Sequence, residues 1–177
     1  MMKMNIFDKG LHAKTILLVL PGGIFNKCIF NALKELSSKK IGYVTINKEA
    51  GTIIDQLKMN KMEHKDFFFL DCVTKTISAI KDEPQIKYIS SPNALTEISL
   101  GIKNCVDIGC EYVIIDSLST LMIYHKSDVL SRFLHNLISK FRTKPDVRLL
   151  LTISEDDRNS DLFKKVELLV DEIIEVK

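Results

Sequence analysis

The sequence predicts an α/β fold with a mostly parallel central sheet. Short apolar segments alternate with amphipathic ones, and several of the apolar segments are uninterrupted, as in strands that are buried on both faces. The chain has 177 residues and shows no low-complexity stretch, internal repeat or long linker. We therefore expect a single domain over residues 1–177, with a loosely ordered N-terminal segment at residues 1–11.

The first part of the chain predicts three strands and two helices. TILLVL, residues 15–20, is a continuous apolar run and therefore a buried strand. The segment after Gly23 has helical periodicity. Its apolar stripe consists of Ile29, Phe30, Leu33 and Leu36. Residues 41–47 are rich in β-branched and aromatic side chains, which indicates a second strand. A short helix is predicted at residues 51–61 and a third buried strand at residues 66–74.

The middle of the chain is less regular. Residues 75–86 lack clear periodicity and predict a surface excursion, followed by a short strand at 87–90. Ser91 and Pro92 suit the N-cap and the first position of a helix, and Gly109 suits its end.

The last part of the chain repeats the alternation. Residues 111–117 predict a buried strand, residues 118–127 a loop, and residues 128–142 the most regular helix of the sequence. The apolar stripe of that helix consists of Val129, Leu130, Phe133, Leu134, Leu137, Ile138 and Phe141. The remaining predicted elements are strands at 147–154 and 171–176 and a helix at 157–169.

Charge and hydropathy exclude some classes of function. The net charge is +2, too small for long-range attraction to nucleic acid or to a membrane. Residues 1–90 carry 14 lysines and 9 acids, whereas residues 91–177 carry 11 basic and 14 acidic residues. This asymmetry indicates either two solvated faces or head-to-tail self-association. We find no secretory segment and no apolar run that could span a bilayer, so we expect a cytoplasmic protein.

The four cysteines predict neither disulfides nor a metal site. Cys28, Cys72, Cys105 and Cys110 show no C-x-x-C spacing, and none lies near a histidine in sequence. We expect reduced thiols and no bound metal. Cys28 near a helix start suggests a lowered thiol pKa, but no arginine follows in the pattern of a phosphatase, so an inert thiol is favoured.

Two segments carry a resemblance to a known family. PGGIFNKC, residues 21–28, joins a strand to a helix as a phosphate-binding loop does, and YVIIDS, residues 112–117, is a buried strand ending in Asp116. With IGYVTINKEAGTIIDQL and YVIIDSLSTLMIYHKSDVLSRFLHNLISKFR, the chain resembles RecA-like ATPases of the KaiC-like branch, small archaeal KaiC-related domains in particular. The resemblance implies a three-layer RecA-like fold with helices on both faces of the sheet.

The phosphate-binding motif of that family, G-x-x-x-x-G-K-[ST], is degenerate here. Aligned on Lys27, its first glycine is Pro21, its second is Asn26, and the hydroxyl that holds magnesium is Cys28. Pro21 lacks an N–H donor, and a thiol is a poor ligand for a hard cation. Gly22 and Gly23 remain inside the loop, where a tight turn and a helix N-terminus could still hold an anion. The resemblance makes Gly22, Gly23, Asn26, Lys27, Cys28 and Asp116 the candidate nucleotide-binding residues.

The catalytic carboxylate of the family is also absent. Relatives place a glutamate just after the second strand, where it activates water, and here Asn47 or Lys48 stands at that position. A shift in register would bring Glu49 there instead. The resemblance also places a polar residue that senses the γ-phosphate at the end of strand 147–154. The candidates for that role are Thr152, Ser154 and Glu155.

These residues favour a non-catalytic domain that acts as a regulatory or scaffolding module. A protein partner or self-association is expected. No cofactor is assigned, and residual binding of ATP with magnesium, without efficient hydrolysis, stays open. Met122, Ile123 and Tyr124 would expose apolar surface in the predicted 118–127 loop, and His125 lies near the expected ligand edge of the sheet.

Two alternatives remain open. One is an active but atypical ATPase that uses Lys27, Asp116 and Glu49. The other is a DNA-recombination accessory, which the low charge and the absence of an arginine-rich patch disfavour.

Overall fold

The computed structural model describes residues 13–176, so the expected N-terminal segment at residues 1–11 lies outside the described residues. Seven strands form the sheet: β1 (Thr15–Leu20), β2 (Ile41–Thr45), β3 (Phe67–Asp71), β4 (Ile86–Tyr88), β5 (Tyr112–Asp116), β6 (Arg148–Ser154) and β7 (Glu172–Glu175). They pair in parallel in the order β4-β3-β2-β5-β6-β1-β7. The α/β fold class and the parallel sheet expected from the sequence are therefore confirmed.

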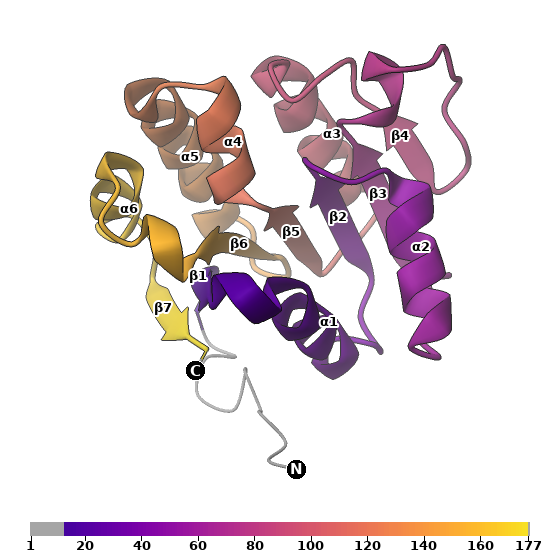
Figure 1. Ribbon diagram of the computed structural model, residues 1–177, viewed down its shortest axis with the longest axis horizontal. Helices are drawn as coiled ribbons and strands as arrows, with labels where there is room; N and C mark the ends of the chain where they lie inside the picture. The colour runs from indigo at the N-terminus through magenta and orange to yellow at the C-terminus, as the bar shows by residue number, and fades with distance from the viewer. Residues whose placement is uncertain (1–12, 177) are drawn as a thin grey trace.

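Helices cover both faces of the sheet, which gives three layers (Figure 1). The helices are α1 (Phe25–Glu35), α2 (Ala50–Met59), α3 (Leu95–Asp107), α4 (Leu118–Tyr124), α5 (Ser127–Arg142) and α6 (Asp161–Val166). Three short 3₁₀ helices are η1 (Gly22–Ile24), η2 (Thr74–Thr76) and η3 (Glu155–Asp157). Apolar side chains of α1 and α2 pack on one face, and those of α3, α4, α5 and α6 on the other.

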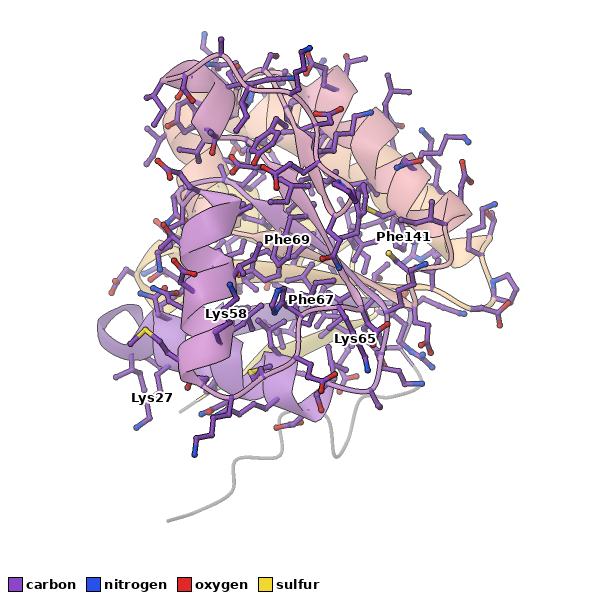
Figure 2. The ribbon with its side chains drawn as sticks, turned by 90° about the vertical axis from the view of Figure 1, so that its right-hand side faces the viewer. Lys27, Lys58, Lys65, Phe67, Phe69 and Phe141 are labelled. Carbon is purple, nitrogen blue, oxygen red and sulfur yellow. The ribbon has the colours of Figure 1, made fainter. Side chains whose placement is uncertain are left out.

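The central strands are apolar throughout because both of their faces are covered. In β1, Leu17 and Val19 pack toward α3–α6, whereas Ile16 and Leu18 pack toward α1 and α2. The same alternation in β3 places aromatic rings under α2. Phe67 and Phe69 stack there with their ring centroids 5.8 Å apart, and Figure 2 shows both rings in the interior.

The carboxyl ends of the parallel strands, including β1, β6, β5, β2 and β3, lie at one edge of the sheet, which we call the carboxyl edge. Leu20 of β1 pairs with Ser154 of β6, and Thr45 of β2 pairs with Asp116 of β5. Ligands of open α/β sheets bind at this kind of edge. The loop between β1 and α1 also lies there, so the fold brings together the segments that the sequence singled out.

The predicted start of α3 is wrong by several residues. The helix begins at Leu95 rather than beside Ser91 and Pro92. The Ser91 hydroxyl instead accepts a hydrogen bond from the Asn93 N–H at 3.2 Å, which forms a local turn ahead of the helix. Gly109 ends the helix as predicted, with φ of +87°.

The segment predicted as a loop at residues 118–127 contains a helix instead, α4. Ser117 caps it by accepting a hydrogen bond from the Thr120 N–H at 3.3 Å, and Leu118 and Leu121 are buried one turn apart. Ile123 and Tyr124 are exposed as expected, at 77% and 42% of their full accessibility.

The predicted helix at residues 157–169 is shorter than expected. It begins at Asp161, where Ser160 caps it by accepting a hydrogen bond from the Phe163 N–H at 3.1 Å. The three acids before it form η3, which returns the chain from β6 across the carboxyl edge. Within residues 13–176, no helix is long and apolar enough to cross a bilayer.

Candidate functional site

The loop that follows β1 folds as a tight turn. Pro21 is extended, and the N–H of Ile24 then donates to the Pro21 carbonyl at 3.2 Å. The N–H of Phe25 donates to the Gly22 carbonyl, and α1 begins at Phe25. A phosphate-binding loop needs its backbone N–H groups turned inward around the anion. Two of these donors are instead used within the turn.

Lys27 and Cys28 point in opposite directions from the first turn of α1. Lys27 is exposed, and Figure 2 shows its side chain directed away from the body of the molecule. Cys28 is 1% exposed and packs with the α1 side of the core, where burial raises the pKa of its thiol and Lys27 partly opposes the shift. The Cys28 thiol is therefore protonated at neutral pH and lies in the core.

Asn26 and Lys48 contact each other across the carboxyl edge. The Lys48 ammonium donates to Asn26 Oδ1 at 2.6 Å, and the Thr45 hydroxyl holds the turn after β2 by donating to the Lys48 carbonyl at 2.6 Å. Asn47 is exposed beside this contact. Glu49 is also exposed and takes the N-cap position of α2, without a side-chain capping bond. The lysine, not Glu49, thus reaches the loop.

Asp116 ends β5 in a buried environment. Its side chain is 4% exposed, and it accepts a hydrogen bond from the Tyr43 hydroxyl at 2.5 Å. Burial raises the pKa of the Asp116 carboxyl, while the Tyr43 hydroxyl and the Lys48 ammonium oppose the rise. Burial and the neighbouring Asp116 also raise the pKa of Tyr43 well above its usual value. The carboxyl is therefore enclosed by protein groups rather than open to a metal ion.

An acidic turn adjoins the loop from the other side. A Cβ added to Gly22 would lie 2.5 Å from Asp156 Oδ2, so the Asp156 carboxylate packs directly against the loop backbone. Glu155 and Asp157 flank it in η3, and the Ser154 hydroxyl donates to Asp156 at 3.2 Å. Negative charge thus lies where a phosphate-binding loop requires positive charge.

The other predicted residues of this edge have structural partners. Thr152 is fully buried and donates to the Ile115 carbonyl at 3.0 Å, which leaves it inside the sheet. His125 Nε2 lies 3.0 Å from the Pro92 carbonyl, so its ring joins the end of α4 to the turn before α3. Within residues 13–176, no cluster of three or more His, Cys, Asp or Glu side chains could hold a metal ion.

Sequence reasoning missed one further acid at this edge. Asp71 ends β3 and is fully buried. Its carboxylate accepts hydrogen bonds at 2.7–2.8 Å from the backbone N–H groups of Ala50, Val73 and Thr74. It thereby anchors the start of α2 and the turn after β3. Its signal in the sequence was the same as that of Asp116, namely an acid that directly follows a buried strand.

Sequence comparisons find no relative: no family model matches the chain, and no curated protein is significantly similar to it. Comparison of the fold gives a clear result. The chain has the fold of a KaiC-like protein. A crystal structure of a KaiC-like protein from the hyperthermophilic archaeon Pyrococcus horikoshii superposes with a TM-score of 0.63 at 14% sequence identity. The match covers 93% of this chain and 72% of that one. The RecA-type fold expected from the resemblance is therefore confirmed, and the comparison shows the fold alone.

Proposed function

We propose that this KaiC-like domain is non-catalytic and acts as a regulatory or scaffolding module. The observation that carries the proposal is the contact between Lys48 and Asn26. Asn47 or Lys48 stands where the resemblance requires a water-activating glutamate, and Asn26 stands where it requires a loop glycine. Neither an asparagine amide nor a lysine ammonium can accept the proton of an attacking water.

The expected loss of rate is large. An oriented general base contributes about two to four powers of ten to rate. The missing magnesium hydroxyl at Cys28 and the N–H donors used inside the turn would remove transition-state charge stabilisation as well. Together these losses support a domain that does not hydrolyse ATP efficiently.

Nucleotide binding should also be weak. A phosphate in the loop would lie beside the Asp156 carboxylate, and two like charges about 4 Å apart repel by roughly 1 kcal/mol in water and 4 kcal/mol near a protein surface. Residual binding would draw on the ammonium groups of Lys27 and Lys48, and Lys48 would have to leave Asn26.

A module of this kind needs a surface for its partner. The outer side of α4 offers apolar side chains beside the carboxyl edge, with Ile123 exposed at 77% and Tyr124 at 42%. The partner is another protein or a second copy of this chain. The excess of basic residues in the first half of the sequence and of acidic residues in the second half suits a head-to-tail contact between copies.

The catalytic part of the proposal is tested by ATP turnover. We expect turnover with and without magnesium to equal the background of a buffer control. Magnesium-dependent turnover that is abolished by Lys27→Ala and by Asp116→Ala would instead support the alternative hypothesis, an active but atypical ATPase.

The scaffolding part is tested by light scattering over a range of protein concentrations. If copies associate through α4, Ile123→Lys lowers the average mass. Leu168→Lys, at a residue that is 83% exposed on the turn after α6, leaves the mass unchanged and is the matched control. A wild-type protein that is monomeric at all concentrations would rule out self-association and leave a different protein as the partner.

A further inference from the structure

The end of α3 carries a pair of cysteines in a defined helix-ending motif. The Gly109 N–H donates to the Val106 carbonyl at 3.0 Å, and the Cys110 N–H donates to the Cys105 carbonyl at 2.9 Å. Gly109 has a φ of +87°. These two bonds and the left-handed glycine define a Schellman motif, in which the side chains at the two ends of the six-residue turn meet.

Here the two side chains that meet are both thiols. Cys105 and Cys110 are 0% and 3% exposed, and their thiols are hydrogen-bonded to each other. Cys105 also packs tightly against β2, because a Cβ added to Gly42 would lie 2.9 Å from its Sγ. The backbone bond of the helix-ending turn thus brings the two cysteines together at the end of α3.

The surroundings make the two thiols chemically different. The hydrogen bond from Cys105 lowers the pKa of Cys110, burial opposes this, and the Lys40 ammonium lowers it further. Lys40 is held at the helix end by donating to the Ile108 carbonyl at 2.5 Å. The pKa of Cys105 is raised, first by its hydrogen bond with Cys110 and then by burial. Cys110 is also the more accessible of the two, at 3% exposed against 0% for Cys105, and we therefore assign it as the nucleophile of the pair.

A small reagent can approach this pair from one side. Cys110 lines a hollow of about 320 Å³ together with Gly109, Lys144 and Val147. The hollow lies at the end of α3 and the start of β5, so it is at the opposite end of the sheet from the loop after β1. The other two cysteines lack these features: burial raises the pKa of both Cys28 and Cys72.

We propose that Cys105 and Cys110 form a thiol–disulfide exchange site that closes an intramolecular disulfide on reaction with a small disulfide of the glutathione class. The Cys110 thiolate attacks one sulfur of the reagent and releases one thiolate, which takes up a proton. Cys105 then gives up its proton and attacks the Cys110 sulfur, which releases the second small thiol. Two cysteine thiols are oxidised, and one small disulfide is reduced to two thiols.

The test is peptide mapping of wild-type protein after incubation with oxidised glutathione. Remaining thiols are alkylated in denaturant, and the protein is digested with trypsin. Cleavage after Lys103 and Lys126 places both cysteines in one peptide, residues 104–126. We expect this peptide to lose the mass of two hydrogen atoms and to escape alkylation within seconds to hours. Reduction before alkylation should restore both alkylation sites.

Single substitutions separate the two roles. In Cys105→Ser, Cys110 should keep a stable glutathione adduct, because no second thiol resolves it. Cys110→Ser should lose the reaction, and Cys28→Ser should behave as wild type. The proposal is overturned if peptide 104–126 of the wild type stays fully alkylated, if it retains the adduct, or if Cys105 or Cys110 pairs with another cysteine. These readouts need no nucleotide, so they stand apart from the proposed function.

Discussion

Replacing Tyr43 by Phe removes only the hydroxyl that hydrogen-bonds Asp116 in the protein interior. Tyr43 is 1% exposed and Asp116 is 4% exposed, so water cannot readily replace the lost donor. A hydrogen bond to a charged group contributes roughly 1.5 to 3 kcal/mol to stability, and an unsatisfied buried acceptor costs a similar amount. We expect Tyr43→Phe to lower the free energy of unfolding by about 2 kcal/mol at neutral pH.

The size of this loss should depend on pH in a definite direction. Burial already raises the folded-state pKa of Asp116, and losing the Tyr43 hydroxyl would raise it further. From the unfolded-state pKa of about 3.9 up to the folded-state pKa, the folded protein binds more protons, so stability falls as pH rises. This window extends to higher pH in Tyr43→Phe. The loss of unfolding free energy in Tyr43→Phe relative to wild type is therefore smallest in acid and grows as pH increases.

Urea denaturation at a series of pH values measures both effects. Tyr112→Phe is the matched control, because Tyr112 is 1% exposed on the adjacent strand and its hydroxyl makes no hydrogen bond with residues 13–176. We expect Tyr112→Phe to change stability by less than about 0.5 kcal/mol at every pH. Equal and pH-independent losses in the two variants would refute the assignment of Tyr43 as the partner of a buried carboxyl.

The remaining predictions concern packing and buried hydrogen bonds. Asp71→Ala leaves the N–H of Ala50 and those of the turn after β3 without acceptors, so denaturation should show a loss of roughly 3 kcal/mol. Gly42→Ala brings a methyl group within 2.9 Å of Cys105 and should lower stability by about 1 to 3 kcal/mol. Gly51→Ala, in α2 with no atom within 4 Å, should instead raise it by up to about 1 kcal/mol. The same sign for both glycine substitutions would contradict the packing described.

The order of the strands and helices could be read from the sequence because each buried strand is an uninterrupted apolar run. Residues 15–20 and 112–116 are examples, and both are central strands in the structure. The apolar stripe of α5 was equally plain, although Val129 at its start is 37% exposed. A covered parallel sheet leaves strong patterns of this kind because both faces of each strand exclude polar residues.

Short helices were harder to predict because capping hydrogen bonds determine whether they form and where they begin. The helix α4 has only two buried positions, Leu118 and Leu121, and depends on the Ser117 cap. At α3, two turn-forming residues were available as helix starts, and Ser91 formed a local turn while the helix began at Leu95. Periodicity over so few residues does not distinguish these outcomes.

The contacts of the candidate site could not be predicted, since each joins segments far apart in the chain. The sequence marked Asn26 and Lys48 as departures from the family pattern, but their hydrogen bond depends on how α1 and the turn after β2 approach each other. The placement of Asp156 against Gly22 depends on η3, whereas the sequence pattern predicts a helix from residue 157. In the sequence, Tyr43 has no feature that separates it from other strand residues. Its role depends on the pairing of β2 with β5, which places Asp116 within hydrogen-bond distance of its hydroxyl.

Calorimetric titration of the purified protein with ATP and magnesium tests the central claim most directly, namely that the chain's own side chains fill the positions that a nucleotide and its metal would need. The account predicts no saturable heat, or weak binding that magnesium does not strengthen and that is insensitive to Asp116→Asn. Tight binding of one ATP per chain that requires magnesium, and that is lost in both Lys27→Ala and Asp116→Asn, would contradict it.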